Sequence, residues 1–442
     1  MKSPTLITLL ASAGLAFAGE PNISKDVAMK VHEWGTFTVL QGSDGRPIEW
    51  YQAPSEIVDL PPFVHQNSMF SKSRGSSGLD LIRMETPVLY FYPEGSQPVN
   101  INVSAAFKNG RITEIFPPAY TSQPPSTTTW QGTLLPPDSP EREKVPAAKG
   151  KRGDHYAAAR AVPDAWLFRG EQHPKLAEVF SQMIAHSPDH PALPDDPTAE
   201  PIDHFIFYRG AGNPGGFSIQ ARQSSKDPGK YTLKNSEKAT IPRLFALRVI
   251  DGMSSWLEIA DLKQAKHSRN GMLNEQSFVF PEATLPVNEA ADQLSSAMVD
   301  ALASEGLTND EAKSMVATWD NLWFTEPGTR VLAVLPQAFA DDMVPLKISP
   351  KPTNIERVFV ARLELINRAQ EEVLMTVLNA PDADPADLST DATKLANVKL
   401  GRYSAGGMER AKALVTQQIQ RRFYTLKEAE TKASEQKVAA TQ

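Results

Sequence analysis

The chain has 442 residues, of which 41% are hydrophobic and 22% are charged, and its formal net charge is -7. This length and composition indicate a globular protein with one large domain or two. Because nucleic-acid-binding proteins usually present a basic surface, the acidic balance argues against nucleic acid as a partner. The sequence has no cysteine, which excludes disulfides, thiolate zinc sites and a cysteine nucleophile.

The first residues have the pattern of a secretion signal. Met1-Lys2 is a short positive start, an apolar run follows from Leu6 to Leu15, and Ala16-Phe17-Ala18 forms a small-x-small cleavage site. That run is too short to span a membrane, and the rest of the sequence has no stretch long and apolar enough to do so. We therefore expect residues 1–18 to be a cleaved signal peptide and the mature protein to be secreted or periplasmic.

A strand is predicted from Val31 to Leu40, and it carries the main candidate site residues. Its two faces hold Val31, Glu33, Gly35, Phe37 and Val39 on one side, and His32, Trp34, Thr36, Thr38 and Leu40 on the other. Glu33 is the one charge on an apolar face. It is either a catalytic carboxylate with a raised pKa or half of a structural ion pair with an arginine. Gly35 is also a candidate position for a bulge.

The segment His32 to Thr38, HEWGTFT, resembles the signature of an uncharacterised family of secreted bacterial proteins. Further pieces that fit the resemblance are Met84 to Tyr90, Phe207 to Gly210, Thr318-Trp319 and Trp323-Phe324. The resemblance covers most of the mature chain. It implies secretion, and it implies no activity, cofactor or catalytic residue.

Residues 27–284 are predicted to form a β-rich body. A strand from Leu81 to Tyr92 contains Pro87, which indicates an edge strand or a strand broken there. Turn dipeptides predict two hairpins, one from Val99 to Phe116 across Asn109-Gly110 and one from Arg243 to Ala260 across Asp251-Gly252. With the shorter strands after residue 202, this pattern is typical of an antiparallel, sandwich-like body.

Residues 285–426 are predicted to be a helix-containing α+β part packed on that body, with a charged tail at 427–442. Thr308-x-x-Glu311 and Asn367-x-x-Gln370 are capping boxes that start helices. Strands are expected at Arg330 to Leu335, Val344 to Ile348 and Arg357 to Ile366, and a last amphipathic helix from Met408 to Leu426. The predicted fold class is therefore α+β.

Two motifs are considered for ligands. Gly210-x-Gly212-x-x-Gly215 matches a dinucleotide pattern, but a strand follows it in place of a helix, so we interpret it as a glycine-rich hairpin loop. His186 and His190 have the spacing of metal ligands, and His173, Asp195, Asp196 or His204 would supply a third. Pro188 prevents a regular helix between the two histidines. We therefore predict no metal site and no cofactor.

The remaining candidates are dispersed over strand ends and loops. The catalytic candidates are Glu33, His32 and Glu85, and the binding candidates are Trp34, Asp44, Arg83, His204 and Arg209; Asp154 and His155 are also near these positions. The first functional hypothesis is a binding or structural protein of the cell envelope. The alternative is a secreted hydrolase, for instance of a glycan, with two carboxylates and an assisting histidine. An open cleft shared by Glu33, Glu85 and His32 would favour the hydrolase, whereas a closed Glu33–arginine pair would favour the scaffold.

Overall fold

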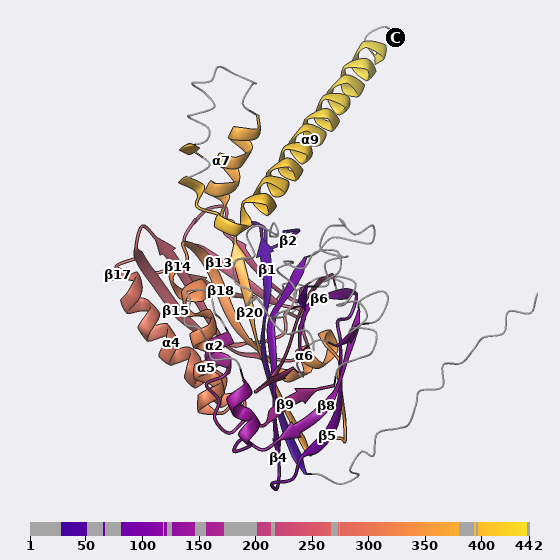
Figure 1. Ribbon diagram of the computed structural model, residues 1–442. Helices are drawn as coiled ribbons and strands as arrows, with labels where there is room; N and C mark the ends of the chain where they lie inside the picture. Colours follow the sequence, from indigo (N-terminus) through magenta and orange to yellow (C-terminus); the bar gives the residue numbers. More distant parts are fainter. Residues whose placement is uncertain are drawn as a thin grey trace, which may run out of the picture.

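The computed structural model describes residues 28–50, 65–66, 81–117, 119–121, 126–145, 156–171, 201–213, 217–266, 273, 275–379, 393–394 and 397–439. The protein is an α+β fold rich in antiparallel strands, with a long helix at its C-terminal end (Figure 1). The predicted signal peptide lies outside the described residues.

One large sheet runs through the molecule and contains eleven of the described strands. In spatial order it consists of β17 (Leu285–Pro286), β15 (Met253–Leu262), β14 (Ile241–Ile250), β18 (Gly328–Leu335), β20 (Asn354–Leu365), β1 (Met29–Gln41), β4 (Ile82–Pro93), β11 (Ile206–Gly212), β6 (Gly110–Phe116) and β3 (His65–Gln66), and β2 (Pro47–Ile48) pairs with β1. β1 pairs in parallel with β20 and antiparallel with β4. Strands from both expected parts of the chain therefore share this sheet.

Two smaller sheets complete the β structure. The first contains β10 (Ile202–Asp203), β9 (Leu167–Gly170), β8 (Thr127–Leu135), β5 (Val99–Ala106) and β19 (Leu346–Ser349), and β7 (Tyr120–Thr121) pairs with β8. The second contains β12 (Ile219–Gln223), β13 (Lys230–Asn235) and β16 (Gln276–Val279).

The helices lie between and after these strands. Their bounds are η2 (Pro140–Lys144), α2 (Tyr156–Ala159), α4 (Val287–Ser304), α5 (Asn309–Asp320), η3 (Asn321–Thr325), α6 (Gln337–Met343), α7 (Arg368–Leu378), η4 (Gly401–Tyr403) and α9 (Ser404–Ala439). The capping boxes at Thr308 and Asn367 are confirmed as the starts of α5 and α7. The final helix begins four residues before the predicted start and runs through most of the predicted tail.

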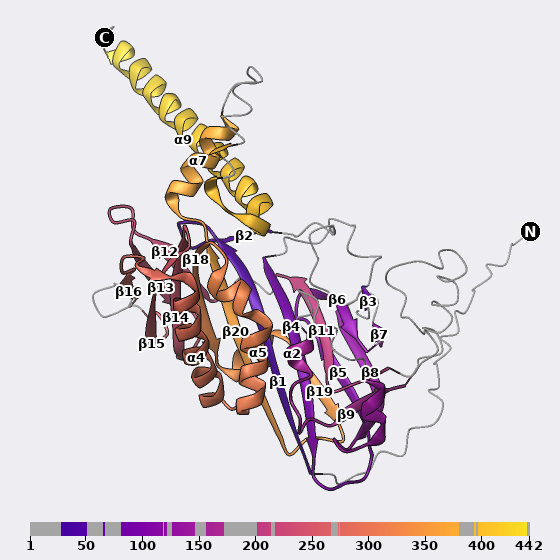
Figure 2. The same cartoon turned by 60° about the vertical axis from the view of Figure 1, so that its left-hand side comes forward.

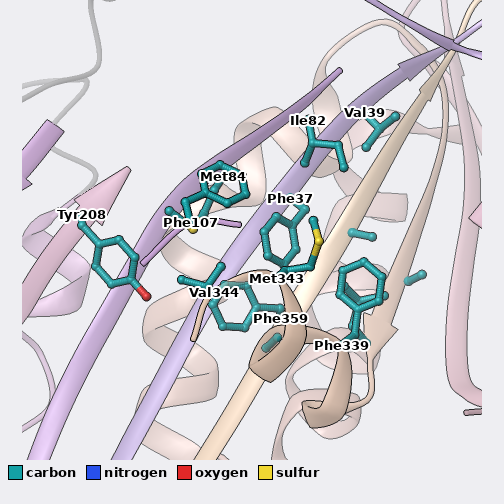
Figure 3. Close-up of a cluster of buried hydrophobic side chains, with 14 of the residues drawn as sticks. Phe37, Val39, Ile82, Met84, Phe107, Tyr208, Phe339, Met343, Val344 and Phe359 are labelled. Carbon is teal, nitrogen blue, oxygen red and sulfur yellow. The ribbon is translucent and has the colours of Figure 1, made fainter. Parts of the chain in front are cut away.

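The large sheet has a hydrophobic core on each face. On the first face its side chains pack against the two smaller sheets and α6, and Figure 3 shows Phe37 and Phe359 of this core beside Phe339 and Met343. On the second face, Trp34 and its neighbours pack against α4, α5 and η3 (Figure 2). We call these faces the sheet face and the helix face. The predicted alternation of β1 is confirmed, because Val31, Phe37 and Val39 lie on the sheet face and Trp34 on the helix face.

Of the two alternatives predicted for β4, the strand broken at Pro87 is confirmed. β4 lies between β1 and β11, so it is not an edge strand. Its pairing is nevertheless broken near Pro87: Trp34 pairs with Val88 and Thr36 with Glu85, which leaves one extra residue in β4. This bulge reverses the faces of the strand. Met84 belongs to the sheet face, and Val88, four residues later, belongs to the helix face.

The two predicted hairpins have different outcomes. β14 and β15 form the hairpin across Asp251-Gly252, with positive φ at both turn residues. The hairpin across Asn109-Gly110 is wrong, because β5 pairs with β8 and β19 whereas β6 pairs with β11 and β3. The turn at Asn109 exists, with φ of 51°, but it leads the chain from one sheet into another. The glycine-rich hairpin between β11 and β12 is likewise wrong, since the two strands belong to different sheets.

Candidate functional site

Glu33 lies in the interior of the sheet face with no exposed surface. Its Oε2 accepts a hydrogen bond from Arg357 Nε at 2.5 Å, and its Oε1 accepts one from the Tyr208 hydroxyl at 2.5 Å. Arg357 also donates to Asp341 Oδ1 and to the carbonyl of Val344, at 2.8 Å each. Every oxygen of the carboxylate is therefore engaged, and Glu33 forms a closed structural pair with an arginine that the sequence did not identify.

The electrostatics of this pair favour the charged state of Arg357. Burial lowers the pKa of Arg357, but the charge of Glu33 and the neighbouring hydrogen bonds outweigh that effect, so its pKa lies above the ordinary value. Burial and the charge of Glu33 raise the pKa of Tyr208 well above its usual value. The phenol therefore stays protonated and serves as a hydrogen-bond donor, which is a structural role.

Glu85 lies on the helix face, opposite to Glu33, as a result of the bulge in β4. The Thr38 hydroxyl donates to its Oε2 at 2.5 Å, and Arg402 Nη1 donates to its Oε1 at 3.3 Å. Burial raises the pKa of Glu85, but the charges of Arg402 and Arg209 and the Thr38 hydrogen bond more than offset this, and the net pKa is lowered. Glu85 is thus a buried anion held by arginines.

The arginines around Glu85 belong to a larger buried ionic cluster. Arg362 donates to Glu326 at 2.6 Å and to Glu364 at 2.7 Å, and Arg330 donates to Glu364 at 2.9 Å. Aromatic rings cover part of the cluster: the guanidinium carbon of Arg83 lies 5.1 Å from the centre of the Trp50 ring, and that of Arg402 lies 5.1 Å from the Tyr403 ring. Arg83 and Arg209 are therefore brought together around Glu85, with Glu85 and Arg209 buried and Arg83 half-buried.

Of the three catalytic candidates, His32 lines a pocket of the described part of the chain. Its Nδ1 lies 2.9 Å from Glu311 Oε2, and the Tyr92 hydroxyl donates to Glu311 Oε1 at 2.6 Å. The backbone N–H of Thr308 donates to the same carboxylate at 2.7 Å, as part of the capping box of α5. Neither Glu311 nor Tyr92 was a predicted site residue. The capping box identified Glu311 as a helix start, but its contact with a histidine 279 positions away has no local sequence signal.

The pocket at His32 has a volume of about 500 Å³. It lies where the start of β1, the end of β4, the α4–α5 connection and the start of β20 meet. Most of its lining residues are polar or charged; the lining consists of Lys30, His32, Tyr92, Val162, Pro163, Asp164, Gly306, Thr308, Asn309, Asp310, Asn354 and Glu356. Three carboxylates face one lysine in this lining, so the pocket suits a neutral or cationic polar ligand better than an anion.

The His32–Glu311 pair has the arrangement of a positioned imidazole. Burial raises the pKa of Glu311, but the hydrogen bond and charge of His32 and the Tyr92 hydroxyl lower it further, and the net pKa is below its usual value. An ionised Glu311 accepts a hydrogen bond, so it holds the proton of the ring on Nδ1. When the ring is neutral, Nε2 is the nitrogen that can accept a hydrogen bond from a hydroxyl group in the pocket.

The other candidates lie away from this pocket. Trp34 is fully buried in the helix-face core. Asp44 pairs with Arg410 at 2.9 Å near α7 and α9. His204 is buried, and burial together with the charges of Arg142 and Arg160 lowers its pKa to about 4.

Among the residues described by the structure, no group of three or more histidines and carboxylates is arranged to hold a metal ion. His186, His190, His173, Asp195, Asp196, Asp154 and His155 all lie outside the described residues. No helix in the described ranges is both long and apolar enough to cross a membrane.

Comparisons with known proteins do not assign the chain to a family. No family model matches it, and no curated protein matches it. Solved structures resemble it weakly. The Fcho1 Mu homology domain of Danio rerio with a bound Eps15 peptide has a TM-score of 0.29 and 7% identity, and the yeast delta-COP-I mu-homology domain complexed with a Dsl1 WxWxV peptide has a TM-score of 0.23 and 6% identity. Each comparison covers 77% of this chain and 97% of the other.

Proposed function

We propose that this protein is a secreted or periplasmic binding protein of the cell envelope, and that it holds a hydroxyl-rich ligand such as a glycan in the pocket at His32. The observation that carries the proposal is the contrast between His32 and Glu33. Glu33 is buried in an ion pair with Arg357, whereas His32, next to it in the chain, lines a pocket of about 500 Å³.

The chemistry of the lining supports a sugar-like ligand. Carboxylates, amides and a histidine Nε2 offer many acceptors for hydroxyl groups, and the exposed part of the Tyr92 ring offers an apolar surface next to them. The excess of carboxylates over lysine disfavours an acidic ligand. Neutral and amino sugars are therefore expected to bind in preference to uronic acids.

The test is direct titration of the mature protein with a panel of neutral, amino and uronic sugars and their short oligomers, by calorimetry. The proposal expects binding of a neutral or amino sugar that is lost in His32→Gln and retained in the control Glu372→Gln, which lies in a separate pocket near α7. Absence of binding across the panel, or binding that His32→Gln leaves intact, would overturn it.

A hydrolase is the second candidate, and the His32–Glu311 pair is the observation that favours it. A carboxylate that orients an imidazole toward a pocket is the usual arrangement of a histidine general base. The originally expected pair of Glu33 and Glu85 does not support this function, because the two carboxylates lie on opposite faces of the sheet. Glu311→Gln keeps a capping-box side chain at this position. If the protein hydrolyses a bound oligosaccharide, Glu311→Gln should slow turnover while binding persists.

A further inference from the structure

Helix α9 extends well beyond the body of the protein. Its 36 residues correspond to a length of about 54 Å. The first part is anchored, since Ala411 is buried and Arg410 Nε donates to Glu371 Oε1 of α7 at 2.8 Å. From Gln418 to Lys432 every residue is exposed, and both views show this part projecting into open space (Figures 1 and 2).

The projecting part carries large apolar side chains on one stripe. Ile419, Phe423 and Leu426 follow each other at spacings of four and three residues, and their exposed fractions are 65%, 59% and 62%. Side chains at these spacings lie on the same face of a helix. Tyr424 beside them is also exposed. Contiguous apolar surface of this kind marks an interaction site.

We propose that this stripe binds α9 of a second copy of the chain, antiparallel, about a two-fold axis at Leu426. In this register Leu426 faces its own symmetry mate, and Phe423 faces Ala429. The bulky ring is thus placed against a small residue, as packing of two helices requires. Arg422 of one helix lies beside Glu430 of the other, and the two-fold axis produces this pair of opposite charges twice.

The charge order along α9 selects this orientation and this occupant. Arg422 lies on the N-terminal side of Leu426 and Glu430 on the C-terminal side. In an antiparallel pair Arg422 of each helix therefore lies beside Glu430 of the other. In a parallel, in-register pair, a residue beside the contact stripe of one helix lies next to the residue five positions later in the other helix. Arg422 would then lie next to Lys427 of the second helix, and the two positive charges would repel each other. The antiparallel arrangement also opposes the two helix dipoles favourably.

Sedimentation velocity of the mature protein is the first test. The proposal expects a concentration-dependent dimer that Phe423→Glu converts to a monomer. Arg422→Glu should weaken the dimer about tenfold, because it replaces two attractive pairs with two repulsive ones. Arg422→Glu with Glu430→Arg should restore it. The matched control is Arg421→Glu, which adds the same charge on the opposite side of the helix and should leave the dimer unchanged.

The absence of cysteine from the sequence allows a test of orientation by engineered disulfides. An equimolar mixture of Phe423→Cys and Ala429→Cys proteins should form the mixed disulfide in preference to either homodimer. A Phe423→Cys homodimer as the main product would indicate a parallel pair and overturn the register. A wild-type protein that is monomeric at about 100 µM would overturn the proposal as a whole. A protein that stays monomeric while it binds anionic vesicles through Phe423 would do the same.

Discussion

Replacing Glu33 by glutamine tests whether this buried carboxylate has a structural role. The substitution keeps the size of the side chain and an oxygen that the Tyr208 hydroxyl can donate to, but it removes the negative charge next to Arg357. Breaking a buried ion pair on one side costs about 3–5 kcal/mol. Arg357 retains the carboxylate of Asp341, so we expect the lower end of that range, about 3 kcal/mol.

The measurement is urea unfolding of the protein, followed by circular dichroism. Asp341→Asn is the matched control, because it removes a second carboxylate from the same arginine. The side chain of Asp341 is 51% exposed, so its loss should cost about 1 kcal/mol or less. Adding Arg357→Met to Glu33→Gln removes the cation that has lost its buried partner and should recover part of the loss. A Glu33→Gln protein as stable as the wild type, or a double variant whose loss is the sum of the two single losses, would refute the ion-pair interpretation.

Three further predictions concern stability. The pKa of His204 in the folded protein is about 4, below its ordinary 6.5, so the unfolded chain binds more protons between these pH values. The free energy of unfolding should therefore fall as pH drops from 6.5 to 4, by at most about 1.4 kcal/mol per pH unit. His204→Gln should flatten that pH profile. Gly35→Ala places a Cβ 2.6 Å from the Phe359 ring and should cost about 1–3 kcal/mol in urea unfolding, with partial rescue by Phe359→Leu. Thr308→Ala removes the cap of α5 and should cost about 1 kcal/mol in the same assay, whereas Thr308→Ser should cost much less; equal losses would contradict the capping role.

The sequence predicted those parts of the fold that local patterns determine. The alternation of β1, the hairpin at Asp251-Gly252 and the capping box at Thr308 each depend on a few neighbouring residues, and each is present. The hairpin at Asn109-Gly110 failed although its turn formed. A turn fixes only the direction of the chain, and the pairing of β5 and β6 depends on strands far away in the sequence.

The candidate site was only partly predictable for the same reason. His32 and Glu33 were identified as chemically unusual because they interrupt an apolar strand. Their partners Glu311 and Arg357 are 279 and 324 positions away, and only the completed sheet brings them close. Glu85 was expected near Glu33, but it lies on the opposite face of the sheet. The extra residue in β4 reverses the faces of that strand near Pro87, and a regular alternation cannot show this.

The structural pair and the pocket depend on each other through the register of β1 and β20. Glu33 lies opposite Arg357 in this parallel pairing, and one step earlier His32 lies opposite Glu356, which lines the pocket on the other face. A slip of one residue would turn every side chain of β1 to the wrong face. A buried ion pair contributes little net stability against an apolar pair, but it penalises such a slip, because both charges would lose their partners. The closed pair at Glu33 therefore helps to fix the position of the pocket at His32, and loss of that pair should weaken binding of the proposed ligand although Glu33 does not line the pocket.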